Sequence, residues 1–167
     1  MGIRRAVVPL TLLTAVGLTA ALVQAAAEPT GRAVVVRDAD GLLLARVPLD
    51  GHRFAVSYRN SLYKSLAEER YDVLPDGRFQ VVELGADEVA VLEEYYMVPT
   101  AARRAPLVDR RQWLAEPDPA HPAIFASLSI AATDLGERTL HVPGRQAVAL
   151  WQLVDDPPTV VLEIEEK

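Results

Sequence analysis

One carboxylate, Glu69, stands where the surrounding pattern predicts an apolar residue. It belongs to a segment in which Ala67, Glu69, Tyr71 and Val73 recur at every second position and therefore share one face of a strand. A carboxylate on such a face must be paired, hydrogen-bonded or protonated, because an isolated charge is costly to bury. Such a group could bind a ligand, act as a general base or hold the strand in place.

A second alternating segment precedes Glu69, and the two segments together predict an antiparallel hairpin. We expect a register that pairs Phe54 with Val73, Val56 with Tyr71 and Tyr58 with Glu69. The polar loop between the arms supplies the nearest partners in sequence, among them Arg59 as a partner for the carboxylate. The candidate binding residues are therefore Tyr58, Arg59, Asn60, Ser61, Glu69 and Tyr71.

The other glutamates give weaker evidence of a functional site than Glu69 does. Neighbouring residues of a strand point to opposite faces, so neither Glu68-Glu69 nor Glu93-Glu94 forms an acid–base pair by itself. Glu83 is in phase with Val81 and would share its face of the strand, so a shared polar pocket is one possibility. We expect Glu68, Glu83 and Glu94 to line a solvated face. The run Tyr95-Tyr96-Met97 either packs at the end of a sheet or lines a ligand pocket.

Several kinds of catalytic site lack their residues in this sequence. There is no cysteine for nucleophilic catalysis, no Gly-x-Ser-x-Gly elbow and no glycine-rich phosphate loop. The histidines, His52, His121 and His141, stand alone, without the spacing of a zinc site. We therefore expect no enzyme activity, no metal and no cofactor. A hydrolase that uses Glu69 as its general base is the less favoured alternative.

Short alternating segments separated by turn residues recur along most of the chain, and helical periodicity is scarce. This rhythm predicts an all-β domain, an antiparallel sandwich or partly open barrel of about nine or ten short strands. Two turns have clear signals, Asp38-Ala39-Asp40-Gly41 and Pro75-Asp76-Gly77. The predicted strands cover residues 33–37, 42–47, 54–59, 67–73, 78–84, 89–96, 124–130, 138–142, 146–154 and 159–165.

A long loop rich in proline and arginine interrupts the strands at residues 99–122. Loops of this length are usually functional or mobile. We expect either a lid or strap pinned by Trp113 or a mobile excursion, with a helical turn around residues 108–114.

The amino terminus resembles an export signal. Arg4 and Arg5 precede an apolar run to Val23, and the small residues Ala25-Ala26-Ala27 follow. Residues 1–27 are expected to form a signal peptide, or an apolar helix at 4–23 that stays as a membrane anchor. Either way residues 28–167 would lie outside the cytoplasmic membrane. Without Arg4 and Arg5 the 17 basic residues become 15 against 23 acidic ones, and the net charge of −8 argues against nucleic acid as a partner.

The central stretch resembles a bacterial family known as domain of unknown function 1850. Its members carry a motif close to Phe-x-x-x-Tyr-x-His-Ser, a short loop and Glu-x-Tyr. Matching residues here are Phe54, Tyr58, Ser61, Glu69 and Tyr71, whereas Asn60 replaces the usual histidine. The resemblance implies a small exported protein, often encoded near TRAP transporters of the TAXI type.

We therefore expect an accessory or binding protein outside the cytoplasmic membrane, whose partners are transporter subunits or a solute-binding protein. The alternative is a purely structural or protein-interaction module, in which the same residues form a buried hydrogen-bond network. A pocket that opens onto Glu69 and Asn60 would favour binding. A closed and fully satisfied network would favour the structural role.

Overall fold

The computed structural model describes residues 31–166 of the chain. This part is all-β, with twelve strands in two antiparallel sheets and two short helical turns, so the predicted all-β, antiparallel class is confirmed. The strands outnumber the nine or ten that the sequence predicts, because several have only two or three residues. The predicted signal segment at 1–27 and its apolar helix lie outside the described residues.

The smaller sheet has four strands in the order β2–β1–β12–β9. The β1–β2 hairpin that the sequence predicts is present: the carboxylate of Asp38 accepts the backbone N–H groups of Asp40 and Leu42, and Gly41 takes a positive φ of 85°. The apolar, β-branched composition of β1 suits its position between two strands. The bounds of these strands are β1 (Ala33–Asp38), β2 (Leu43–Pro48), β9 (Ser127–Ala131) and β12 (Thr159–Glu165).

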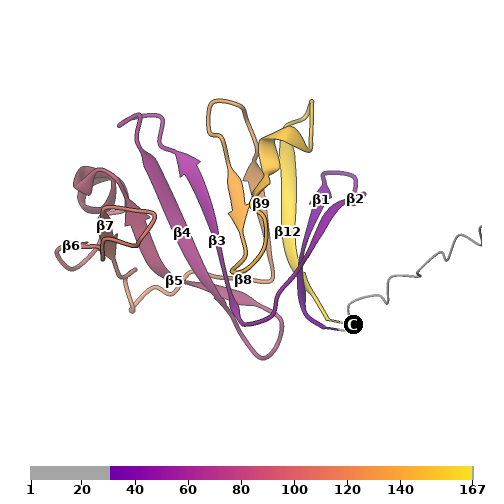
Figure 1. Cartoon of the computed structure of the whole chain (residues 1–167), viewed down its shortest axis with the longest axis horizontal. Coiled ribbons are helices and arrows are strands. Elements are labelled where there is room, and N and C mark those ends of the chain that lie inside the picture. The colour runs from indigo at the N-terminus through magenta and orange to yellow at the C-terminus, as the bar shows by residue number, and fades with distance from the viewer. Residues whose placement is uncertain (1–30, 167) are drawn as a thin grey trace, which may run out of the picture.

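The larger sheet has eight strands in the order β11–β10–β3–β4–β5–β7–β6, and β8 also pairs with β5. In Figure 1 the two sheets stand side by side, with β6 and β7 at the end of the molecule farthest from β1 and β2. The bounds are β3 (Arg53–Arg59), β4 (Leu66–Val73), β5 (Phe79–Ala86), β6 (Arg103–Arg104), β7 (Trp113–Ala115), β8 (Ile124–Phe125), β10 (Thr139–His141) and β11 (Val148–Ala149).

The β3–β4 hairpin forms as predicted, but its register differs. The structure pairs Phe54 with Tyr71, Val56 with Glu69 and Tyr58 with Ala67, two residues away from the prediction. A shift of two residues keeps every side chain on the predicted face, because the side-chain period of a strand is two. The predicted partner of Glu69 was therefore wrong, and the predicted face was right.

A β-bulge in β5 changes which residues of this strand face inward. Arg70 pairs with Glu83 and Tyr71 pairs with Val81, so Val82 is an extra residue on β5. Before the bulge Phe79 and Val81 are buried, and after it Leu84 and Ala86 are buried. The bulge therefore moves Glu83 out of phase with Val81 and onto the opposite face, beside Arg70.

The hydrophobic core lies between the two sheets and takes residues from both. An aromatic group at its centre comprises Phe54 and Tyr71, whose rings stack 4.9 Å apart, and Phe79, which meets Phe54 edge to face at 5.2 Å. The smaller sheet contributes fully buried Val36 and Leu162. Inward-facing residues of β3, β4 and β5 thus hold the wall on which Glu69 lies.

One predicted strand is wrong, and another is much shorter than predicted. Residues 89–96 form a helical turn, η1 (Val91–Tyr95), because Val91 and Leu92 are both fully buried and a strand would turn one of them outward. Residues 146–154 contain only β11 and the 3₁₀ turn η2 (Leu150–Gln152).

The segment at 99–122 holds the β6–β7 hairpin, in which the guanidinium of Arg104 lies 4.3 Å from the centre of the Trp113 ring. The predicted helical turn at 108–114 is wrong: no helix forms there and β7 begins at Trp113.

Candidate functional site

Glu69 lies on the inner face of β4, opposite Val56 of β3 and Leu84 of β5. Its carboxylate is hydrogen-bonded by two phenols: the hydroxyl of Tyr71 donates to Oε2, and that of Tyr96 donates to Oε1 at 2.6 Å. The hydroxyls of Tyr96 and Tyr58 are 2.8 Å apart. Tyr71 of β4 and Tyr96, just after η1, therefore hold this carboxylate directly, and Tyr58 of β3 joins the network through Tyr96.

The three phenols keep their protons at neutral pH. The pKa of Tyr58 is raised to about 12, chiefly by burial and also by the charge of Glu69, although the hydrogen bond with Tyr96 lowers it. Burial, followed by the charge of Glu69, also raises the pKa of Tyr71 and that of Tyr96. Tyr71 and Tyr96 therefore act as hydrogen-bond donors to Glu69 and orient its carboxylate, and Tyr58 is hydrogen-bonded to the hydroxyl of Tyr96.

A cavity of about 280 Å³ opens onto this carboxylate. Glu69 and Tyr96 provide its polar wall, and Asp118 and His121 also line it, joined by a 2.8 Å contact between Asp118 Oδ2 and His121 Nδ1. No lysine or arginine is among its lining residues in the described part of the chain. The rest of the lining is mostly apolar: Val81, Leu84, Met97, Val98, Pro99, Pro117, Ala123 and Phe125.

The structure does not bring all six candidate residues to this cavity. Arg59 binds Glu137, with Nε and Nη2 at 3.0 and 2.8 Å from Oε2, so the predicted Arg59–Glu69 pair is wrong. Asn60 closes the β3–β4 loop, where its Oδ1 accepts the N–H groups of the residues two and three positions later. Ser61 is exposed. Tyr58, Glu69 and Tyr71 remain as one network, and buried Asn60 adjoins it at Tyr58, where, against the larger effect of burial, a hydrogen bond with the Asn60 side chain lowers the pKa of the phenol.

Tyr96 is a network member that the sequence pattern did not identify. It follows η1, whose last residues return the chain toward β4. The tyrosine-rich run 95–97 was the available signal, since a pocket lining was one of its two interpretations. Tyr95 contacts Tyr96 edge to face at 5.2 Å, and Met97 has a positive φ of 50° beside the cavity.

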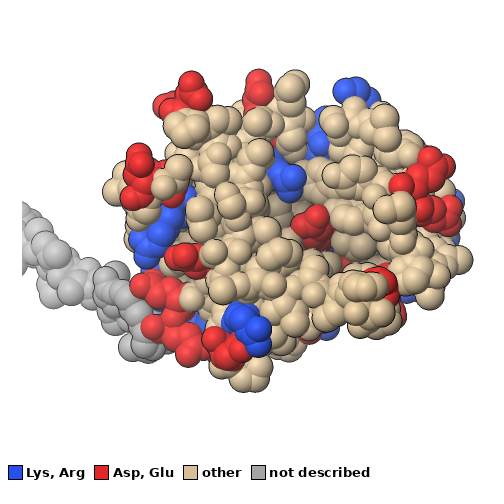
Figure 2. Space-filling view, turned by 180° about the vertical axis from the view of Figure 1, so that it is seen from behind, with Lys and Arg blue, Asp and Glu red and all other residues tan. Residues whose placement is uncertain are grey.

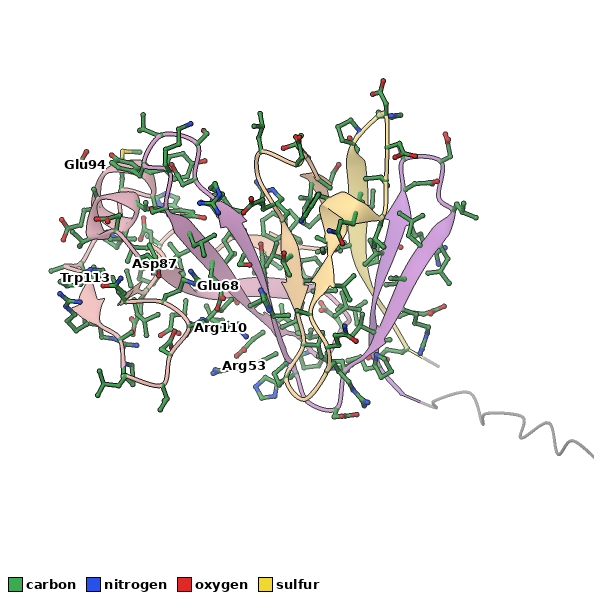
Figure 3. All side chains as sticks on the ribbon, turned by 45° about the horizontal axis from the view of Figure 1, so that its top comes forward. Arg53, Glu68, Asp87, Glu94, Arg110 and Trp113 are labelled. Atoms are coloured by element: carbon green, nitrogen blue, oxygen red, sulfur yellow. The ribbon has the colours of Figure 1, made fainter. Side chains whose placement is uncertain are left out.

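Glu68, next to Glu69, lies on the outer face of β4 and is fully buried, so the predicted solvated position is wrong. Its Oε1 accepts hydrogen bonds from Arg70 Nε at 2.7 Å and Arg110 Nη2 at 2.9 Å, and its Oε2 accepts from Arg110 Nε at 3.0 Å. The Nε of Arg111 lies 3.8 Å from Oε2. Figure 3 shows Glu68 beside Arg110, which comes from the segment between β6 and β7.

Arginine pairing also determines the ionisation of Glu68. Burial raises the pKa of its carboxyl, but the hydrogen bonds and charges of Arg110 and Arg70 outweigh burial and lower the pKa overall. Glu83 joins the same group through Arg70 Nη1 at 2.7 Å, and Asp109 accepts from Arg70 Nη2 at 2.6 Å. The arginines of the predicted loop thus cover the outer face of the sheet.

The three histidines do not converge. The Nε2 of His141 lies 2.8 Å from Ser57 Oγ on the outer face, His121 pairs with Asp118, and the Nε2 of His52 is 3.9 Å from Asp72. Within residues 31–166, no group of three His, Asp or Glu side chains could hold a metal ion.

Comparisons with known proteins find no match to a family model, to a curated protein or to a solved structure. The resemblance to domain of unknown function 1850 therefore stays a prediction. Among the described residues no helix is both long and apolar enough to cross a membrane.

Proposed function

We propose that this chain is a binding protein whose inner cavity takes a small molecule with a cationic group on an apolar body. The observation that carries the proposal is the Glu69 carboxylate, held by Tyr71 and Tyr96 at the wall of a cavity whose described lining includes no lysine or arginine. A carboxylate accepts at about four lone-pair sites, so two phenol donors leave it able to accept an ammonium group.

The apolar lining supports the second half of the proposal. Val81, Leu84 and Phe125 offer an apolar contact surface, whereas Asp118 adds a second negative charge. A cation is favoured in such surroundings because opposite charges attract more strongly where water is partly excluded. Pockets for small molecules usually combine an apolar lining with a few polar groups that fix orientation.

We also propose that the protein acts outside the cytoplasmic membrane, as an accessory to a TRAP-type transporter or its solute-binding protein. The export-like segment at 1–27 and the resemblance around Glu69 support this setting. Gene neighbourhoods of related chains test it: consistent absence of a transporter gene would remove the support for the transporter link.

Benzylamine and benzyl alcohol are matched probes for the inner cavity, because they differ mainly in the charge of the polar group. By calorimetric titration we expect benzylamine to bind the natural chain at least about tenfold more tightly than benzyl alcohol. Glu69→Gln should abolish this preference, whereas Glu163→Gln, a change on exposed β12 surface, should leave it intact.

The same titration separates the alternatives. A purely structural role predicts that Glu69→Gln lowers the melting temperature while the natural chain binds neither probe, which would refute the binding proposal. The hydrolase alternative needs a second carboxylate near Glu69. Asp118 is the candidate for that group, because it lines the same cavity. Retained benzylamine preference in Glu69→Gln would also refute the proposal, because the cation would then be bound elsewhere.

A further inference from the structure

A second cavity, of about 440 Å³, lies on the outer face of the larger sheet. It shares no lining residue with the Glu69 cavity, and the alternation of β4 separates the two: Glu69 faces inward and Arg70 faces outward. Its floor comes from β3, β4, β5 and β10, and residues 108–110 cover it. Figure 3 shows Arg53 and Arg110 close together on this side of Glu68.

Basic and acidic residues line opposite sides of this outer cavity. His141 on β10 and Arg53 on β3 line one side, whereas Glu83 on β5 and Glu116 just after β7 line the other. Neighbouring strands lie about 4.8 Å apart, so β3 and β5 are separated by about 10 Å. Arg70 lies between them, neutralised by its own acidic partners.

Several charged groups at the two sides can still form hydrogen bonds or ion pairs with a ligand. Arg110 binds Glu68 through Nε and Nη2, which leaves its Nη1 free of protein partners within the described chain, and its side chain is 49% exposed. Arg53 is 66% exposed and pairs only with Asp72 among the residues described. Glu116 is exposed and makes no ion pair within residues 31–166.

The histidine contributes a neutral donor. Burial lowers the pKa of His141, and the charges of Arg110 and Arg111 lower it further although Glu68 raises it. The lining then holds three arginines against Glu83, Asp109 and Glu116, which balance in charge. A simple anion or a simple cation would meet repulsion at one side, whereas a dipolar molecule satisfies both sides.

We propose that the outer cavity binds a dipeptide with free termini. Its carboxylate lies toward Arg53 and Arg110, and its ammonium group lies toward Glu116 and Glu83. Two extended residues span about 7 Å, and a hydrogen bond at each end covers the remaining distance, whereas a single amino acid is too short. Val108 at the mouth and Ala55 on the floor contact the peptide body.

L-alanyl-L-alanine, its N-acetyl form and its C-terminal amide test the proposal by calorimetric titration at low ionic strength. We expect the free dipeptide to bind at least about tenfold more tightly than either capped form and than L-alanine. The proposal would be overturned if the free and capped forms bound with equal affinity, or if the free dipeptide did not bind at concentrations up to about 10 mM. Equal binding of L-alanine would overturn the assignment to a dipeptide.

Two variants test which residues bind the ammonium group and the carboxylate of the dipeptide. Glu116→Gln should weaken the free dipeptide about tenfold and leave the N-acetyl form unchanged, because that form has no ammonium group. Arg53→Gln should weaken the N-acetyl form and leave the amide unchanged. Matched controls are Arg78→Gln and Glu163→Gln, exposed residues outside the cavity, together with Glu69→Gln in the inner cavity.

Neither test variant removes a buried group, and melting curves verify the fold. If Glu116→Gln and Arg53→Gln bind all forms as the natural chain does, the site is refuted. If only Glu69→Gln weakens binding, the dipeptide occupies the inner cavity and the outer site is refuted. Failure of the benzylamine experiment leaves this result unaffected, because the two cavities share no residue.

Discussion

Replacing Glu68 by glutamine is expected to destabilise the protein far more than replacing an exposed glutamate. The glutamine amide keeps the shape of the side chain but removes the charge and turns one acceptor into a donor. That donor would face the guanidinium groups of Arg70 or Arg110, which bind both oxygens of the natural carboxylate. Arg111, only 9% exposed, would keep Asp87 at 3.0 Å from its Nη1 but lose the second carboxylate, which lies 3.8 Å from its Nε.

The size of the loss follows from burial. Removing one partner of a buried ion pair costs about 3–5 kcal/mol, because the remaining charge stays unpaired. Arg110 is half exposed and can be hydrated, which places the expected loss for Glu68→Gln at the lower end, about 3 kcal/mol. With a urea slope of about 2 kcal/mol per M, the unfolding midpoint should fall by about 1.5 M.

The acid limb of the stability profile provides a second readout. The pKa of Glu68 is lower in the folded protein than its ordinary value of 4.5. The stabilisation is therefore complete above pH 4.5 and is lost as the pH falls through the folded-state pKa. Glu68→Gln should remove this contribution, so its stability should fall less steeply with acid than that of the natural chain.

Urea unfolding followed by tryptophan fluorescence, at neutral pH and across the acid limb, measures both quantities. Glu163→Gln is the matched control, since Glu163 lies on a strand, pairs with Arg37 and is exposed; its effect should stay within about 0.5 kcal/mol. A loss below about 1 kcal/mol for Glu68→Gln, or an unchanged acid slope, would refute the account of Glu68 as a paired, buried charge.

Three further predictions concern other parts of the larger sheet. Gly85→Ala should cost about 1–3 kcal/mol in thermal unfolding, because a Cβ there would lie 2.7 Å from Cγ of Arg111; a neutral result would mean that Arg111 relocates freely. Asn60→Ala should cost about 1 kcal/mol and speed amide exchange in the β3–β4 loop, whose N–H groups lose their acceptor; unchanged exchange would contradict that role. In an alkaline absorbance titration, Tyr58 and the two tyrosines bound to Glu69 should ionise only near pH 12 or above, and ionisation of all tyrosines near pH 10 would exclude the network.

Local patterns predicted much of the fold because the information lies within a few residues. The turn at Gly41 and the alternation of β3 and β4 each depend on neighbours in sequence. The same alternation placed Glu69 on the inner face. It could not fix the register, because a shift of two residues preserves the face of every side chain.

The parts that sequence reasoning missed depend on contacts between distant segments. Glu69 meets Tyr96, which lies 27 residues away on an irregular turn. Glu68 meets Arg110, which lies 42 residues away in a segment without regular periodicity. Alternation placed Glu68 outside the core correctly, but it gave no sign that a later segment covers that face.

The bulge of β5 lets the strand hold one extra residue without changing which cavity its neighbours line. Val82 has no partner of its own on β4, so Glu83 still lies opposite Arg70 and faces the outer cavity, and Leu84 faces the inner one. Deleting Val82 would make the ladder regular and leave both side chains on their present faces. A regular strand that kept Val82 would instead turn Glu83 inward and Leu84 outward, so both cavities depend on the bulge rather than on the length of the strand.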